Sequence, residues 1–270
     1  MEVRAEFVPT AEAALEARLL LEELKDLVRA EVLEDARILV AELVTNSVRH
    51  AGLSPQDRIT VRIVLSSEIL RAEVCDPGPG FEAPPKRPGF RQTRGWGLYI
   101  VEQIAERWGI ERDERQKCVW FELGPVRKVV IEKHAAGGRR RGKRTSSFSA
   151  QIREVRGVPV VAASGEVDLA TFAELQATIE EAVERAGNSP GAMILDLHGV
   201  DFFDSMGIGV LVGSTRKLRE RGGEVYLVAR EGPCLRVLTV TGLDKVFKIH
   251  ADLDPALKEA TSRSDYSREP

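Results

Sequence analysis

Four segments in the first 125 residues alternate between apolar and polar positions, with the period of two that is typical of β-strands. These segments are residues 2–8, 58–65, 69–75 and 117–123. Between the first two, leucines recur with helical spacing, which predicts a helix over residues 11–29 with Thr10 as its N-cap. A second helix is predicted over residues 33–49, ended by Gly52, and a third from Gly95 to Arg107. Strands and helices are therefore expected together in this part of the chain.

The same kind of pattern starts again near residue 148. A hairpin is predicted from residues 148–154 and 158–164, with its turn at Arg156-Gly157. Helices and strands then alternate. The predicted helices cover residues 170–186, 205–221 and 233–240, and the predicted strands cover residues 192–197, 224–228 and 246–249. Gly187 is expected to follow the first of these helices. This order predicts a second sheet with helices, so the fold class is α+β and α/β in two parts.

The domain boundaries follow from where these patterns stop. We predict a first domain over residues 1–125, a basic linker over 126–148, a second domain over 149–262 and a tail over 263–270. The linker is rich in glycine and arginine, a composition that favours a solvated spacer over a nucleic-acid contact. A spacer of about 24 residues spans roughly 25–30 Å on average, so the two domains can dock in cis at an effective concentration on the order of millimolar.

Composition narrows the class of protein. The 270 residues are 43% hydrophobic and 30% charged, with a net charge of −3, which is typical of a globular protein without a nucleic-acid footprint. No apolar run has the length of a membrane span, and no signal peptide is evident at the start. Cys75, Cys118 and Cys234 form no C-x-x-C and are expected to be separate buried thiols in a reducing cytoplasm. We therefore predict a cytoplasmic protein with no membrane and no direct nucleic-acid partner.

Glu42 and Asn46 are the first candidates for chemistry. They are four residues apart in the predicted second helix, so their side chains share one face. A carboxylate that can accept a proton, one turn from an amide that can ligate a hard cation, suits phosphoryl transfer. Taken alone, the pair is more often two solvated polar residues.

Two glycine-containing segments further along the chain change that balance. Residues 76–81, Asp-Pro-Gly-Pro-Gly-Phe, follow a predicted strand, and their glycines let the backbone approach a planar ligand while Asp76 accepts from an exocyclic amine. Residues 95–98, Gly-Trp-Gly-Leu, open a predicted helix whose free N–H groups suit a phosphate tail. Each segment alone is also compatible with an ordinary turn.

In this order, the three segments resemble the nucleotide-binding boxes of the GHKL ATPases. The segments are ELVTNSVRHA at 42–51, DPGPGF at 76–81 and RGWGLYIV at 94–101, followed by VWFEL at 119–123, and the closest resemblance is to anti-sigma-factor serine kinases. The resemblance implies that Glu42 is the catalytic base and that Asn46 ligates Mg²⁺. It also implies an ATP site formed by Asn46, His50, Asp76, Gly78, Gly80, Arg94, Gly95, Gly97 and Leu98. By the same resemblance, residues 82–94 form a lid from which Arg91 or Arg94 reaches the γ-phosphate, and Arg18 contacts partner proteins.

Ser205 is the candidate of the second half, where a predicted strand meets a predicted helix. Two interpretations are open: Ser205 caps the helix, which residue physics favours, or its exposed hydroxyl accepts a phosphate. The segments SGEVDLAT at 164–171, VDFFDSMGIGVLV at 200–212, RERGGEVYLV at 219–228 and VLTVTGLDKVF at 237–247 resemble a STAS-domain anti-sigma-factor antagonist. That resemblance implies that Ser205 is the phosphoacceptor, with Asp168 and Asp204 flanking it. Met206 stands where the family has a second hydroxyl residue.

Together the resemblances imply a partner-switching regulator of sigma-factor-dependent transcription. The kinase domain would sequester a sigma factor and use ATP and Mg²⁺ to phosphorylate Ser205 of the fused STAS domain, in cis or in trans. Its expected partners are a sigma factor, a STAS domain, a serine phosphatase and a second copy of the kinase domain. The alternative is a scaffold that binds ATP and partners without phosphoryl transfer. A histidine kinase or chaperone-like ATPase is disfavoured, because no acceptor histidine helix precedes the first domain and no transducer domain follows it.

Overall fold

The computed structural model describes residues 1–79, 87–113, 115–126, 147–186 and 191–266. Its backbone divides into two compact units, residues 1–84 with 104–146 and residues 85–103 with 147–270. No helix in those described ranges is both long and apolar enough to cross a membrane. The predicted linker lies almost entirely outside the described residues, as do Gly80, Gly187 and the first half of the predicted lid.

The first unit contains a five-stranded sheet in the order β1-β2-β3-β5-β4. The strands are β1 (Glu2–Phe7), β2 (Ile59–Leu65), β3 (Leu70–Asp76), β4 (Arg107–Arg112) and β5 (Lys117–Leu123). Every neighbouring pair is antiparallel. Alternate residues of the central strands are buried on one side and partly exposed on the other, as a sheet covered on one face requires. The four strands predicted from this period are therefore confirmed.

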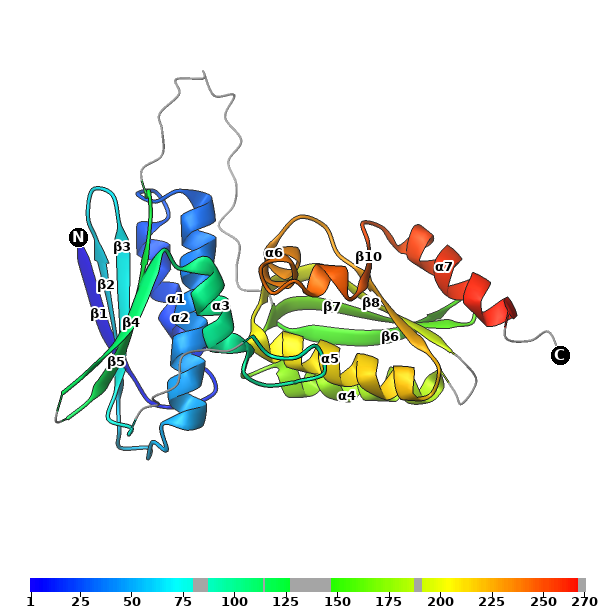
Figure 1. The fold of residues 1–270 in the computed structure, drawn as a ribbon, viewed down its shortest axis with the longest axis horizontal. Helices are drawn as coiled ribbons and strands as arrows, with labels where there is room; N and C mark the ends of the chain where they lie inside the picture. The colour runs from blue at the N-terminus through cyan, green and yellow to red at the C-terminus, as the bar shows by residue number, and fades with distance from the viewer. Residues whose placement is uncertain (80–86, 114, 127–146, 187–190, 267–270) are drawn as a thin grey trace, which may run out of the picture. The chain divides into compact units, whose positions relative to one another are not determined.

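Helices cover the buried face of this sheet (Figure 1). They are α1 (Ala13–Leu19), a short 3-10 helix (Leu20–Leu24) and α2 (Ala30–His50). Gly52 has a φ of +66° directly after the C-cap Ala51, so the prediction that it ends this helix is confirmed.

The single helix predicted over residues 11–29 is wrong. The α-helical part ends at Leu19, and the backbone of Arg29 is already extended before α2 begins. Leu21, Leu24 and Val28 are all buried. The 3-10 helix turns more tightly than an α-helix, so it buries these side chains while the chain turns back toward α2. Thr10 is not the N-cap either, because that position is Glu12, which makes no side-chain cap bond.

The fourth strand, β4, was not predicted, because the helix before it was expected to continue to Arg107. That helix, α3 (Trp96–Ile104), ends three residues earlier. Gly109 of β4 lies beneath the indole of Trp120 on β5, where a Cβ would come within 2.8 Å of the ring. The glycine breaks the alternating pattern that marks the other strands and is required by the aromatic ring above it.

The second unit contains α3 and a mixed sheet in the order β10-β9-β8-β7-β6. The strands are β6 (Ser149–Val155), β7 (Val158–Val167), β8 (Ala192–Phe203), β9 (Glu224–Val228) and β10 (Lys248–His250). β6 and β7 form the predicted hairpin, and Arg156 and Gly157 both have positive φ at its turn. The remaining strand pairs are parallel, which confirms the predicted α/β sheet.

The helices of this unit are α4 (Phe172–Arg185), α5 (Ser205–Glu220), α6 (Pro233–Val240) and α7 (Leu253–Tyr266), with a 3-10 helix over Leu243–Lys245. Helix α7 was not predicted. It packs Ala256, Leu257 and Ala260 into a cluster of buried residues that includes Ile194 and Tyr226 of the sheet. Its apolar face is short and built largely from alanine, so its periodicity is weak in the sequence.

The prediction of three separate buried thiols is wrong for two of the cysteines. Cys75 and Cys118 are directly opposite each other on β3 and β5 and form a disulfide. Cys234 is free and buried, as predicted, and burial together with the nearby Asp201 carboxylate raises the pKa of its thiol.

Candidate functional site

The C-terminal half of α2 carries two of the predicted site residues. Glu42 is completely buried, whereas Asn46, one turn further on, is partly exposed. The Nδ2 atom of Asn46 is buried and has no hydrogen-bond partner among the described residues. A buried amide without a partner is costly in a folded protein, so its position favours a ligand that completes its hydrogen bonding.

Asp76, at the end of β3, is the most firmly held of the predicted site residues. Its Oδ2 atom accepts a hydrogen bond from Ser47 Oγ at 2.5 Å and forms an ion pair with Lys117 Nζ at 2.9 Å. Its Oδ1 atom accepts from the backbone N–H of Gly78 at 2.9 Å. The Ser47 contact joins the carboxylate to α2, which also carries Glu42 and Asn46. The structure therefore brings the helix residues and Asp76 to one end of the same helix–sheet layer.

Lys117 is a site residue that the sequence analysis missed. It lies opposite Asp76 in the β3–β5 register, and both side chains face the helices. Their exposed fractions are 5% and 0%, so the ion pair is shielded from water. The signal was present in the strand pattern, because residues 117, 119, 121 and 123 all face inward and a lysine at such a position needs a buried partner.

Gly78 has a structural reason in addition to the one predicted, and its place beside a nucleotide stays a prediction. We expected its missing side chain to make room for a planar ligand. A Cβ at this position would come within 2.5 Å of Ala51 Cβ, at the end of α2. The glycine is therefore required by the close approach of the loop after β3 to the helix.

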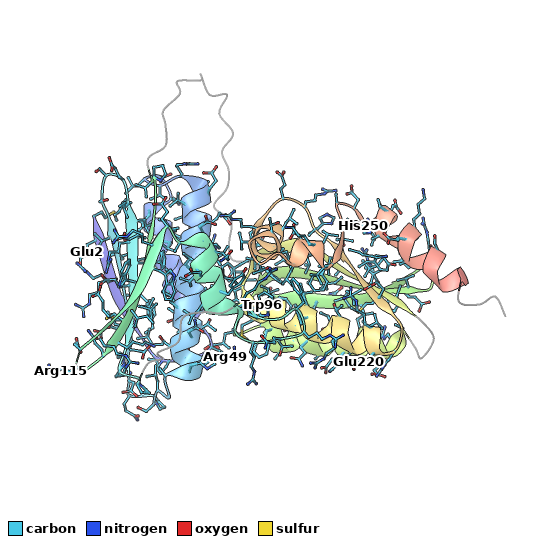
Figure 2. All side chains as sticks on the ribbon, in the orientation of Figure 1. Glu2, Arg49, Trp96, Arg115, Glu220 and His250 are labelled. Atoms are coloured by element: carbon cyan, nitrogen blue, oxygen red, sulfur yellow. A yellow bond between two sulfur atoms is a disulfide. The ribbon has the colours of Figure 1, made fainter. Side chains whose placement is uncertain are left out.

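Several of the predicted nucleotide-binding residues lie in residues 85–103, which belong to the second unit. Gly95 has a φ of +90°, which favours glycine, and Trp96, labelled in Figure 2, begins α3. The indole N–H of Trp96 donates a hydrogen bond to Gln92 O. Gly97 is buried in the first turn and Leu98 is partly exposed. Arg91 and Arg94 are both exposed. That these groups meet the Asp76 site stays a prediction.

Two further predicted residues lie on helices of the first unit. His50 is the last residue of α2 and is exposed, next to Arg49 (Figure 2). Arg18 lies in α1 and is only 1% exposed, so its side chain is buried in this conformation. A role of His50 toward ATP and of Arg18 toward partner proteins both stay predictions.

The donor set fits a magnesium–nucleotide complex rather than an all-protein metal site. Among the described residues, no group of three or more His, Cys, Asp or Glu side chains is placed to hold a metal ion. Mg²⁺ bound with a nucleotide takes most of its ligands from phosphate oxygens and water, and one protein side chain is then sufficient. Asn46 would ligate the metal through its Oδ1 atom, whereas its unpartnered Nδ2 group is a hydrogen-bond donor and fits a phosphate oxygen.

The second candidate site is at the carboxyl edge of the parallel strands β7 and β8. Val167 and Phe203 are paired in register, so the residues that follow them, Asp168 and Asp204, leave the sheet side by side. Both are buried, with exposed fractions of 2% and 0%. Asp168 Oδ1 accepts from the N–H of Ala170, which orders the loop before α4. Asp168 and Asp204 therefore lie next to each other at this edge, Ser205 follows Asp204 in the chain, and the role of the two carboxylates beside a phosphoacceptor stays a prediction.

Ser205 is the first residue of α5, but it is not the cap. The N-cap is Asp204, whose Oδ1 accepts a hydrogen bond from the N–H of Met206 at 2.8 Å. The interpretation of Ser205 as a cap is therefore wrong, because its neighbour already performs that function. Ser205 itself is partly exposed.

Comparison with known proteins identifies both halves. Residues 7–123 match the family of histidine kinase-like ATPase domains, and residues 149–256 match the STAS domain. The chain is 32% identical over 111 residues to the anti-sigma-F factor antagonist RsfB of Mycobacterium tuberculosis, covering 41% of this chain and 88% of that protein. It is 26% identical over 117 residues to the serine-protein kinase RsbW of Listeria monocytogenes, covering 39% of this chain and 73% of that protein.

A solved structure, an anti-sigma factor antagonist from Mycobacterium paratuberculosis, is 33% identical and covers 43% of this chain and 95% of its own, with a TM-score of 0.39. The matched families follow the order in which the two candidate sites occur along the chain. The chain therefore belongs to the anti-sigma-factor antagonists of the STAS family, and it joins the STAS domain to an N-terminal histidine kinase-like ATPase domain.

Proposed function

We propose that this chain is a cytoplasmic partner-switching regulator of a sigma factor, in which the ATPase domain is a serine kinase and Ser205 is its phosphoacceptor. In this scheme the kinase domain sequesters the sigma factor, and the unphosphorylated STAS domain competes for the kinase domain. Phosphorylation of Ser205 ends that competition, and a serine phosphatase restores it.

The observation that carries the proposal is the arrangement around Asp76. Its carboxylate is buried, fixed by Ser47, Lys117 and Gly78, and joined through Ser47 to the helix that bears Glu42 and Asn46. A carboxylate that is fixed in advance recognises the exocyclic amine of a base with little loss of side-chain entropy. The unpartnered amide of Asn46 supports a ligand at the adjacent turn of α2.

Each residue then has a defined task. Mg²⁺–ATP, when bound, would supply the γ-phosphoryl group and leave as ADP, and the metal would neutralise part of the phosphate charge. Asp76 would accept a hydrogen bond from the adenine amine, and Asn46 Oδ1 would be the protein ligand to the metal while its Nδ2 group donates to a phosphate oxygen. The Glu42 carboxylate takes the proton from Ser205 Oγ as the hydroxyl attacks.

The acceptor site supports a regulatory role for the modification. A phosphoserine carries roughly −1.5 to −2 charges at neutral pH, and it would be placed beside Asp168 and Asp204. The added charge repels acidic groups on any docked surface and changes the binding face without removing the cap of α5. We propose that this is how phosphorylation weakens binding of the STAS domain to the kinase domain, in cis or within a kinase-domain dimer.

The proposal is tested by intact-protein mass spectrometry after incubation with Mg²⁺ and ATP. The expected result is a gain of one phosphate, located at Ser205, which is lost in Ser205→Ala and in Glu42→Ala. Glu34→Ala is a matched control, because Glu34 is an exposed carboxylate on the same helix, and it should keep the gain. No gain in the unmodified protein, or a gain that survives Ser205→Ala, would contradict the assignment.

The burial of Glu42 favours a second candidate, a nucleotide-binding scaffold that transfers nothing. A base must contact the acceptor hydroxyl, whereas the Glu42 side chain is completely buried in this conformation. Saturable ATP binding without any phosphate gain would identify the scaffold. Loss of ATP binding in Asp76→Asn would be common to both candidates.

A further inference from the structure

The disulfide lies one residue from the Asp76–Lys117 ion pair. In the β3–β5 register, Cys75 is opposite Cys118, and the next pair is Asp76 opposite Lys117. That pair is the last of the ladder, since β3 ends at Asp76 and β5 begins at Lys117. The covalent bond therefore closes the strand ends that hold the predicted base-recognition carboxylate.

The disulfide and the ion pair are on opposite faces of the sheet. Successive residues of a strand point to opposite sides, so the cysteines face outward while Asp76 and Lys117 face the helices. Cys118 is partly exposed and Cys75 is 8% exposed. A small thiol or disulfide can therefore reach the sulfur atoms from outside without entering the nucleotide site.

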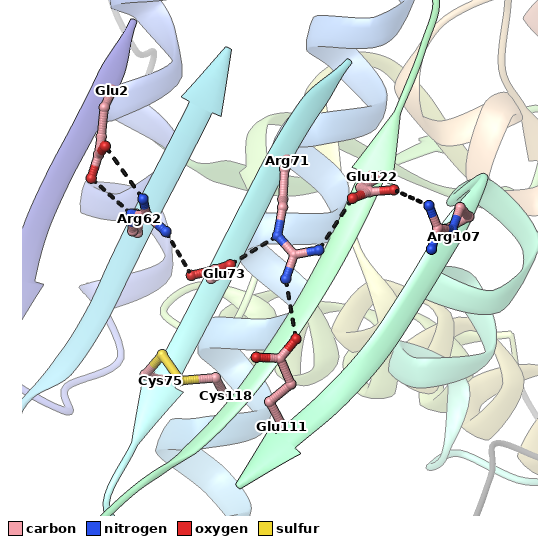
Figure 3. A network of polar contacts seen from close by, with 9 residues as sticks. All are labelled: Glu2, Arg62, Arg71, Glu73, Cys75, Arg107, Glu111, Cys118 and Glu122. Carbon is pink, nitrogen blue, oxygen red and sulfur yellow. Dashed lines mark hydrogen bonds and ion pairs between the residues drawn. A yellow bond between two sulfur atoms is a disulfide. The ribbon is translucent and has the colours of Figure 1, made fainter. Parts of the chain in front are cut away.

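The rest of the outer face is held by charges rather than by covalent bonds. A ladder of ion pairs crosses the sheet beside the disulfide (Figure 3), formed by Glu2, Arg62, Glu73, Arg71, Glu111, Glu122 and Arg107. Arg71 is its centre, with contacts to Glu73 and Glu122, and its guanidinium lies 4.0 Å from the ring of Trp120. The middle of the β3–β5 pair is thus fixed independently of the cysteines, and the covalent restraint acts on the last rows alone.

We propose that Cys75 and Cys118 are a reversible oxidation site that controls nucleotide affinity by restraining the Asp76–Lys117 row. This inference deepens the proposed function and rests on Asp76 being part of the nucleotide site. In the oxidised protein the terminal row stays paired and Asp76 stays in place. In the reduced protein the row is held by the contacts of Asp76 alone. Opening the row returns both charged groups to water, so the paired state has little net advantage, and the carboxylate is in the binding position for part of the time.

The chemistry requires only a low-molecular-weight disulfide and its thiol. The thiolate of Cys118, the more exposed cysteine, attacks the small disulfide and expels one small thiolate, which leaves a mixed disulfide on the protein. The thiolate of Cys75 then attacks the Cys118 sulfur and expels the second small thiolate. Two electrons and two protons pass from the protein dithiol to the small disulfide, and excess small thiol reverses both steps.

The size of the effect follows from the fraction of time the row is paired. Apparent affinity falls in proportion to the population of the binding-competent state, so a row that is intact about a third of the time weakens binding about three-fold. The effect is on affinity for the base, and the fold of the sheet is kept by the ion-pair ladder and the buried face.

The experiment compares full-length protein oxidised with glutathione disulfide and reduced with dithiothreitol. Titration with the fluorescent probe mant-ATP in the presence of Mg²⁺ gives the dissociation constant, and hydrogen exchange measured by mass spectrometry reports the amides of residues 74–78 and 115–119. We expect binding to weaken about three-fold or more on reduction and to recover on reoxidation. The variant with both Cys75→Ser and Cys118→Ser should match the reduced protein in either condition. Cys234→Ala removes the buried thiol and should keep the full redox response.

Each outcome decides the proposal. A dissociation constant that is equal in the two states, or smaller in the reduced one, overturns it, as does a protein whose thiols glutathione disulfide does not oxidise. If mant-ATP binds in neither state, the proposed nucleotide function fails, and hydrogen exchange then decides the restraint. Faster exchange of the strand ends on reduction supports the restraint, and unchanged exchange overturns it.

Discussion

The buried ion pair between Lys117 and Asp76 allows a quantitative test of how the site is held. Lys117→Met removes the ammonium group and keeps a side chain of similar length. The Asp76 carboxylate would then be left buried, with 0% of its side chain exposed and its Oδ2 atom without the 2.9 Å contact. Removing one partner of a buried ion pair costs about 3–5 kcal/mol, because the other charge is left uncompensated.

The lower end of that range is expected for this pair. Ser47 Oγ and the N–H of Gly78 still donate to the carboxylate after the substitution. Hydrogen bonds to a charged group each contribute about 1.5–3 kcal/mol, so they offset part of the loss. We therefore expect Lys117→Met to lower the free energy of unfolding of the ATPase domain by about 3 kcal/mol.

Tryptophan fluorescence can follow this domain separately in urea. Of the three tryptophans of the chain, Trp108 and Trp120 lie on β4 and β5 of the first unit, whereas Trp96 lies on α3 of the second unit, so all variants are compared in a Trp96→Phe background. Lys25→Met is a matched control, because Lys25 is exposed, and it should change the stability by less than about 0.5 kcal/mol. All proteins are measured with the disulfide oxidised.

A double-mutant cycle separates the pair from other effects of the substitution. Combining Lys117→Met with Asp76→Asn leaves no buried charge, so the double variant should be more stable than Lys117→Met alone. A loss below about 1 kcal/mol for Lys117→Met, or strictly additive losses in the cycle, would refute the reasoning that the carboxylate depends on this lysine.

Three other predictions concern the STAS domain. Ser205→Glu should bind the ATPase domain more weakly than Ser205→Ala in a pull-down of separately expressed halves, and equal binding would contradict the charge-repulsion argument. Asp204→Ala removes the cap hydrogen bond from Met206 and should lower the free energy of unfolding of this domain by about 1 kcal/mol, measured by thermal unfolding followed by circular dichroism. An unchanged transition would show that the cap contributes nothing. The pKa of Glu259 is lowered mainly by its hydrogen bond from Lys248. The Glu259 carboxylate therefore stabilises the folded protein at pH values above its pKa in the unfolded chain. This stabilisation is lost as the pH falls through the lowered pKa of the folded protein. Glu259→Gln should therefore flatten the acid side of the stability profile, and a profile identical to that of the unmodified protein would rule the contribution out.

The sequence predicted the strands of the first unit better than its helices. Strands β1, β2, β3 and β5 are covered on one face only, so apolar and polar residues alternate along each of them with a period of two. The prediction of a single helix over residues 11–29 was wrong, because the spacing of leucines indicates which residues are buried but not where the backbone turns. Tertiary packing of Leu21, Leu24 and Val28 decided that turn.

The relative positions of the predicted site residues were predicted correctly where the spacing was local. Glu42 and Asn46 lie one turn apart on α2, as their separation of four residues requires. The partners of Asp76 were not predicted, because the register that places Lys117 opposite it joins residues 41 positions apart along the chain. The disulfide was missed for the same reason: Cys75 and Cys118 are separated by 43 residues, and no local motif reports the pairing of two antiparallel strands.

The cap of α5 shows why the acceptor site can change its charge without losing its fold. If Ser205 were the cap, a phosphate on its oxygen would remove the acceptor that orders the first turn of the helix. Asp204 makes that hydrogen bond instead, so a phosphate on the hydroxyl of Ser205 would leave the N–H of Met206 with its partner. The positive end of the helix dipole also favours a phosphate by about 0.3–1 kcal/mol, which offsets part of the repulsion from Asp168 and Asp204. We therefore expect the domain itself to tolerate the proposed modification, with the main effect on whichever surface docks against the start of α5.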